Sequence, residues 1–120
     1  MSFAVTDAVS AALGAALDGV SVRQRVIADN IANIDTPGFR ASSVDFESSL
    51  RAAIAGGQVE NGTPLSVTAT PTDTPVGPNG NNVDLRKESL AAMQSQFQYQ
   101  LLTRAVNDRY SLLRTAVTGQ

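Results

Sequence analysis

Residues 31–40 read IANIDTPGFR, and this stretch ends a long helical pattern with a closely specified turn. Pro37 has no backbone N–H and disfavours the α region at the residue before it, so a helix must end before this proline. Proline followed by glycine fits the two central positions of a type II turn, the second of which takes positive φ. Glycine adopts that conformation without steric cost. The stretch therefore predicts a helix end followed by a turn over Thr36, Pro37, Gly38 and Phe39.

Upstream of this turn, apolar residues recur at a seven-residue interval, which is typical of one helix face. The interval predicts a helix from about residue 7 to residue 33 or 34, roughly 40 Å long at 1.5 Å per residue. Gly14 and Gly19 each weaken such a helix by about 1 kcal/mol relative to alanine. Each glycine therefore marks either a close contact with a neighbouring backbone or a soft stretch of helix. The expected packing seam of this helix consists of Leu13, Val20, Ile27 and Ile34.

A second seven-residue pattern near the C-terminus predicts another long helix over residues 84–120. Asp84 is a candidate N-cap and Gly119 a candidate helix stop. The expected seam consists of Leu85, Ala92, Tyr99, Val106 and Leu113. A separate apolar flank consists of Leu101, Ala105, Leu112 and Ala116. Because one pair of helices cannot bury both faces, we expect this flank to be exposed in a single chain and to mark an interaction surface.

The residues between the two long helices have a weaker pattern. Residues 45–55 predict a short helix, which Ser43 or Asp45 can cap. Residues 56–83 are rich in Gly, Pro, Asn and Thr, and only residues 65–70 alternate like a strand. Such a stretch is long for a loop and predicts an extended or disordered linker, or a surface arm.

The predicted fold is mostly α. Long N- and C-terminal helices pack as a coiled-coil-like pair, joined by the short helix and the Gly/Pro/Asn/Thr-rich linker. We expect one structural unit with four parts. These are an N-terminal helix at residues 1–35, a turn and short helix at 36–55, a flexible linker or arm at 56–83, and a C-terminal helix at 84–120.

The composition argues against several classes of function. The 120 residues contain no His and no Cys, which excludes metal sites built on these ligands and Cys or Ser–His nucleophiles. No phosphate-binding glycine loop precedes the single lysine, Lys87. A net charge of −2 without a basic stripe argues against nucleic-acid binding. We therefore expect no enzyme activity, no cofactor and no metal ion.

Targeting signals are also missing from the pattern. No apolar run reaches the length of a transmembrane helix, so we expect no direct membrane span. The first residues do not have the pattern of a cleaved signal peptide. Taken alone, these features favour a cytoplasmic protein.

Two motifs together resemble the bacterial flagellar basal-body rod proteins. They are IANIDTPGFR at residues 31–40 and GNNVDL at residues 80–85, supported by QFQYQ at 96–100 and SLLRTAV at 111–117. The first motif is typical of the broader axial family of rod, hook and hook-associated proteins. The short length and the GNNVDL helix start are most similar to the proximal-rod, FlgB type. Phe39 and Arg40 stand where Tyr or Lys also occur in such proteins.

The resemblance implies a structural subunit that polymerises through its terminal helices into the axial drive shaft needed for motility. It implies self-association and contacts with other rod proteins, with the adaptor at the rod base and with the MS ring. It also implies a position in the periplasmic rod of the basal body. Export through the flagellum's own type III apparatus, without a cleaved signal peptide, reconciles this position with the missing targeting signals.

The expected assembly contacts involve both helix seams and the turn. The turn over residues 36–39 would set the direction of the chain leaving the N-terminal helix, against a neighbouring subunit. Asn30 and Asn33 either cap carbonyls or bridge subunits through their amides, or they are solvated surface amides. Two alternative functions stay open: another axial component of distal-rod or hook type, and a soluble helical adaptor or export chaperone that binds amphipathic partner helices.

Overall fold

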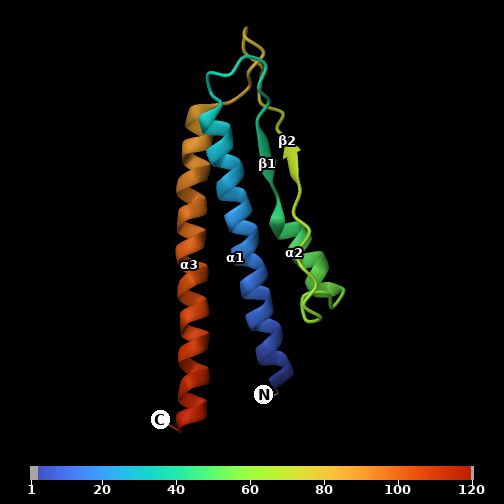
Figure 1. The fold of residues 1–120 in the computed structure, drawn as a ribbon, viewed down its shortest axis with the longest axis vertical. Coiled ribbons are helices and arrows are strands. Elements are labelled where there is room, and N and C mark those ends of the chain that lie inside the picture. Colours follow the sequence, from blue (N-terminus) through green and yellow to red (C-terminus); the bar gives the residue numbers. More distant parts are fainter. Residues whose placement is uncertain (1–2, 120) are drawn as a thin grey trace.

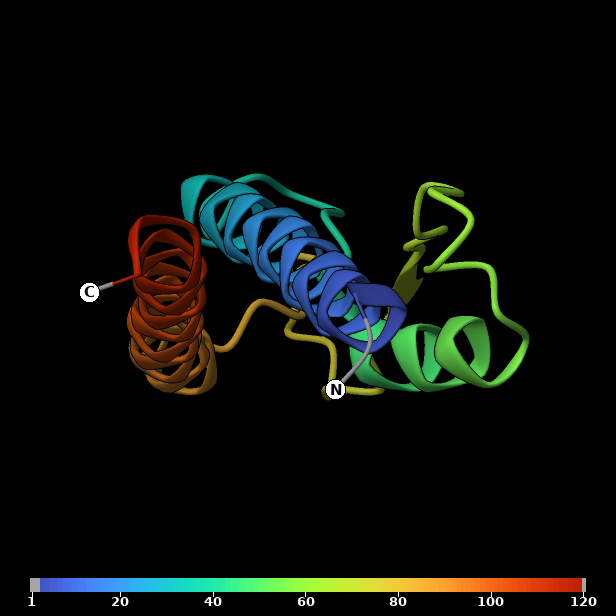
Figure 2. The ribbon, with the colours of Figure 1, turned by 90° about the horizontal axis from the view of Figure 1, so that it is seen from below.

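The computed structural model describes residues 3–119 and shows an elongated molecule of 64 × 29 × 14 Å. Two long antiparallel helices, α1 (Phe3–Ala32) and α3 (Leu85–Thr118), lie side by side along its length (Figure 1). The elements between them in sequence are β1 (Ser42–Val44), α2 (Phe46–Ala55) and β2 (Ala69–Pro71). Seen along the helices, α1 lies between α3 and α2 (Figure 2). The predicted mostly α fold, with its paired terminal helices and extended linker, is confirmed.

Capping residues set the ends of α2 and α3 as the sequence predicted. The Asp84 carboxylate accepts hydrogen bonds from two N–H groups in the first turn of α3 (3.0 and 3.2 Å). Gly119 ends α3 in the left-handed region, with φ of 74°. Of the two candidate caps for α2, Asp45 serves, and its carboxylate accepts from the Ser48 N–H (3.2 Å).

The end of α1 differs slightly from the prediction. The helix ends at Ala32, one or two residues early, because the Ile34 N–H bonds to the Ile31 carbonyl (3.2 Å) and thereby leaves the i to i−4 ladder. Ile34 therefore lies in the turn after α1, and the predicted seam of the N-terminal helix loses its last member to this turn.

The buried core lies where α1, β1 and α2 meet. Val20 of α1 is fully buried, and Phe46 at the start of α2 is 4% exposed. The Phe46 ring lies directly on Gly19, where an added Cβ would come within 2.5 Å of the ring. Gly19 therefore marks a close contact, but with the Phe46 side chain rather than with the neighbouring backbone that the sequence analysis expected. Leu102 of α3 packs against the same cluster and lines one pocket with Val20 and Phe46.

The segment between α2 and α3 runs back along the molecule rather than away from it. Its strand β2 pairs antiparallel with β1, with Ser42 opposite Pro71 and Val44 opposite Ala69. The strand thus lies at the end of the stretch that alternated in the sequence. Leu65, before the strand, packs against the core. Within the described part of the chain, no helix is long and apolar enough to cross a bilayer.

Candidate assembly interface

The turn after α1 has the geometry that its proline and glycine predicted. Gly38 has φ of 77°, and the Phe39 N–H donates to the Thr36 carbonyl across the turn (3.2 Å). Gly80 of the second motif lies against this turn, where an added Cβ would be 3.3 Å from the Gly38 Cα. The two sequence motifs therefore meet at one end of the helix pair, at the top of Figure 1.

Asn81 binds the end of α1 to the start of α3. Its side-chain amide donates to the carbonyls of Asn33 (2.9 Å) and Thr36 (2.8 Å). Its side-chain oxygen accepts from the Val83 N–H (2.7 Å), so one side chain spans the chain entering α3 and the chain leaving α1. Asn81 is buried, and these bonds satisfy its polar groups.

Asn82 makes a second connection beside the first. Its side-chain oxygen accepts from the Ala41 N–H (2.6 Å), and its amide donates to the Thr74 carbonyl (3.2 Å) and the Thr72 hydroxyl (3.4 Å). The Asn82 backbone N–H also donates to the Phe39 carbonyl (3.3 Å). These bonds hold the segment before α3 against the segment after the turn.

Asn30 supplies the third buried amide. It is 2% exposed, donates to the Ser42 carbonyl (2.7 Å) and accepts from the Ser42 N–H (3.2 Å). Asn33 instead donates to the Asp29 carbonyl one turn back (2.8 Å) and accepts from the Thr36 hydroxyl (3.0 Å). Both amides bond within the chain. We call the buried set of Asn30, Asn81 and Asn82 the asparagine joint.

Arg23 is a centre of polar contacts that the sequence analysis did not single out. Its guanidinium donates to the Val44 carbonyl (2.7 and 3.1 Å) and, through two nitrogens, to the Glu47 carboxylate. It also donates to the Gln98 side chain of α3 (3.1 Å) and lies 4.6 Å from the centroid of the Phe46 ring. One side chain of α1 thus connects β1, α2 and α3.

The pKa of the Glu47 carboxyl reflects this arrangement. Hydrogen bonds from Arg23 hold the pKa below its ordinary value of 4.5, although partial burial acts in the opposite direction. The side chain of Arg23 is 18% exposed and that of Glu47 44%. The Arg23 side chain is therefore largely shielded from water, whereas the Glu47 side chain stays partly exposed.

The predicted seam of α1 is partly buried in the single chain. Val20 and Ile27 are buried, and Leu13 is half-buried. Ile27 lines a cavity between α1 and α3 together with Ala92, a predicted seam residue of the second helix. The structure thus brings together the middle of the two predicted seams.

On α3, the buried line is displaced from the predicted seam. Glu88 and Ser95 are buried, whereas Leu85 is 50% and Tyr99 40% exposed. Since each buried residue follows a predicted one by three positions, the contact face is rotated by about 60°. The remaining predicted residues, Ala92, Val106 and Leu113, are half-buried.

A line of large apolar side chains on α3 is exposed in the single chain. Four side chains spaced at three, four and four residues form one face, and their exposed fractions range from 49% to 71%. We call this set the α3 stripe; it consists of Leu90, Met93, Phe97 and Leu101. Leu101 belonged to the flank that the sequence predicted to be exposed, and so did Leu112, which is 64% exposed. An exposed apolar stripe of this kind is a candidate surface for packing against another chain.

An elongated helix pair, closed at one end by bonded amides and apolar along its outer face, defines a structural subunit that assembles with other helices. The model of the family described as flagella basal body rod protein matches residues 13–40. These residues contain Gly19, Arg23, Asn30 and the turn at Gly38.

Individual relatives extend this similarity over most of the chain. The flagellar basal body rod protein FlgB of Bacillus subtilis is 37% identical over 115 residues, which cover 87% of this chain and 88% of the relative. FlgB of Borreliella burgdorferi is 35% identical, covering 72% and 78%, and FlgB of Aeromonas hydrophila is 31% identical, covering 88% and 89%. The chain belongs to the FlgB family of flagellar basal-body rod proteins, and it is a structural component of the basal-body rod.

Proposed function

We propose that this chain is a subunit of the proximal part of the rod and polymerises through α1 and α3 into the axial drive shaft needed for motility. The observation that carries this proposal is the α3 stripe. Its four large apolar side chains are 49% to 71% exposed, so the folding of a single chain leaves much of their surface in water. Leu101, at the end of the stripe, also lines a pocket with Val20 and Phe46 of its own chain. Packing of such a stripe between helices of neighbouring subunits removes it from water, at about 25 cal/mol per Å² of apolar surface.

The asparagine joint and Arg23 give the subunit a defined shape for this assembly. The joint fixes the relative position of α1 and α3 at one end, and Arg23 connects the middle of α1 to α2 and α3. Packed helices meet through specific ridges and grooves, so a fixed helix pair presents the same surface in every copy. Repetition of one head-to-tail contact between identical subunits is what builds a regular rod.

Partners and location belong to the same proposal. By similarity to FlgB proteins, the neighbours are further copies, other rod proteins, the adaptor at the rod base and the MS ring. The subunit would act in the periplasmic part of the basal body, after export through the flagellum's own type III apparatus. The polymer would transmit rotation as a structural element rather than catalyse a reaction.

The stripe is tested in the native bacterium after deletion of the gene. A double variant, Met93→Gln with Phe97→Gln, keeps side chains of similar length but makes the stripe polar. We expect this variant to be expressed and helical, yet to restore neither rods in purified basal bodies nor swimming. The matched control is Gln94→Ala with Gln100→Ala, which changes exposed polar positions on the same helix. Normal rods with the polar stripe would contradict the proposal.

A further inference from the structure

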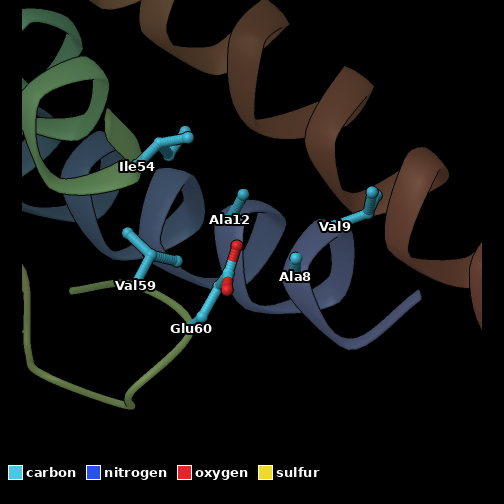
Figure 3. Close-up of a pocket in the computed structure, with 6 residues that line it drawn as sticks. All are labelled: Ala8, Val9, Ala12, Ile54, Val59 and Glu60. Carbon is cyan, nitrogen blue, oxygen red and sulfur yellow. The ribbon is translucent and has the colours of Figure 1, made fainter. Parts of the chain in front are cut away.

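A groove of about 260 Å³ lies between the first half of α1 and the end of α2 (Figure 3). We call it the α1–α2 groove; it is lined by Ala8, Val9, Ala12, Ile54, Val59 and Glu60. We infer that the α3 stripe of a second copy of this chain packs into this groove. The inference rests on the proposed function and specifies the contact by which one copy holds the next.

The groove has the size and the chemistry to receive large apolar side chains. Val59 is buried at 6% exposure, whereas Val9 and Ile54 are 39% and 49% exposed. In Figure 3, Ile54 and Val59 lie on one side and Ala8 and Ala12 on the other, with the Glu60 carboxylate between them. Because a cavity of about 150 Å³ is enough to bind benzene, this groove has room for an aromatic ring and more.

The charges of the two surfaces are complementary. Glu60 is the charged residue of the groove lining. On α3, Arg104 follows Phe97 by two helical turns and therefore lies on the same face as the stripe. Among the described residues, neither Glu60 nor Arg104 has an ion pair or a side-chain hydrogen bond, so both are available for a partner.

The spacing along α3 allows both contacts at once. Phe97 and Leu101 are four residues apart and form one apolar surface, and Arg104 lies one turn further. With Phe97 and Leu101 in the groove, the Arg104 guanidinium is placed toward Glu60. This arrangement satisfies the charge of Glu60, which lies within the groove.

The contact must join two copies, because no described residue of α3 lines the α1–α2 groove of its own chain. The two surfaces are different parts of the same subunit, so the contact is head-to-tail rather than symmetric. Contacts of this type generate open helical assemblies when the rotation between copies does not close. A second copy of the chain is therefore the occupant that suits both the chemistry of the groove and a rod.

The absence of cysteine from the sequence allows a clean cross-linking test. Two full-length versions with different tags are co-expressed in the native bacterium, one with Gln100→Cys beside the stripe and one with Asn61→Cys beside the groove. Both positions are exposed, and neither belongs to the proposed contact. We expect a short bismaleimide reagent to join the two versions in purified basal bodies. The control replaces Asn61→Cys by Thr68→Cys, an exposed position near β2.

Charge-reversal variants test whether Arg104 of one copy pairs with Glu60 of the next. We expect Arg104→Glu or Glu60→Arg alone to reduce the cross-linked fraction by up to about fivefold, the effect of one exposed ion pair. The two reversals together, each in both tagged versions, restore the yield. Failure of this rescue, or a yield equal to that of the Thr68→Cys control, would overturn the groove contact. In basal bodies that contain the chain, that result leaves the proposed rod function standing.

Discussion

At the scale of single residues, the contact between Gly19 and Phe46 sets the distance between α1 and α2. The ring occupies the space that any larger side chain would need, so a helix-weakening glycine is required for tight packing. Gly14, five residues earlier on the same helix, has no neighbouring atom within 4 Å of an added Cβ. The same residue type thus has opposite energetic consequences at two sites on one helix.

We expect Gly19→Ala to lower the free energy of unfolding by about 1–3 kcal/mol, because the added methyl group displaces the Phe46 ring. Gly14→Ala should raise it by up to about 1 kcal/mol, because alanine favours the helix and meets no neighbour. Urea denaturation followed by circular dichroism measures both changes. A similar gain in stability from both substitutions would mean that the ring does not rest on Gly19.

The Arg23–Glu47 pair predicts a dependence of stability on acid. The folded-state pKa of Glu47 lies below the ordinary value of 4.5, so folding favours the ionised carboxylate. This contribution is fully present above pH 4.5 and is lost as the pH falls through the lower folded-state pKa. We therefore expect the urea midpoint of the chain to fall as the solution is acidified below that pH.

Glu47→Gln is the control for this effect. It removes the titrating group, so the midpoint of the variant should be lower at neutral pH and should change less on acidification. Some dependence will persist, because bonds from Ser48 also lower the pKa of Asp45. An unchanged acid dependence in Glu47→Gln would show that the pair does not contribute to folding.

At the scale of elements, the turn after α1 requires glycine for its backbone conformation and not because a larger side chain would clash with neighbouring atoms. Gly38 has positive φ, yet an added Cβ there would meet no atom within 4 Å. We expect Gly38→Val to cost about 1–3 kcal/mol through backbone strain and to abolish rods in basal bodies. Gly38→Asn, which tolerates this region better, should retain more rods.

Gly56→Val serves as the matched control for the turn. Gly56 caps α2 with φ of −88°, a conformation that valine can adopt. Basal-body yield and swimming compare the three variants. Equal loss from the valine substitutions at Gly38 and Gly56 would show that the turn is an ordinary loop.

The elements that the sequence predicted well depend on local chemistry. Asp84, Gly119 and the proline–glycine turn act on residues no more than a few positions away, so their roles are visible in the sequence. The rotation of α3 was not predicted, because the heptad pattern locates apolar residues while the buried positions include Glu88 and Ser95. Bonds from the joint fix where α3 begins and thus which side of it faces α1.

The roles of other residues were not predicted because their hydrogen-bond partners are distant in the sequence. The amide of Asn81 bonds to a carbonyl 48 residues away, and Arg23 reaches Gln98 across 75 residues. Asparagine has many solvated roles on a surface, so its residue type gives no indication of such a partner. The motif that contains Asn81 and Asn82 pointed to the family, but only the fold reveals that these side chains connect two helices.

At the scale of the whole molecule, the buried core is thin for the length of the helices. The large side chains of α3 are mostly exposed, and the buried apolar cluster involves a short part of α1 with β1 and α2. We expect the isolated chain to be marginally stable, with frayed helix ends, and to gain helix content on assembly. Circular dichroism at low concentration measures this. Full helicity with a sharp cooperative melt of the monomer would contradict the expectation.

The antiparallel pairing of the first and last helices also determines when the chain can fold. Contacts between α1 and α3 have high sequence separation, and the joint closes a loop of 48 residues, at an entropic cost of about 3 kcal/mol. The two long helices cannot pair until almost the whole chain is available, so the α1–α3 contacts form after the core of α1, β1 and α2 can form. A polypeptide that emerges from a narrow channel one end first therefore completes its helix pair only when the final helix is released.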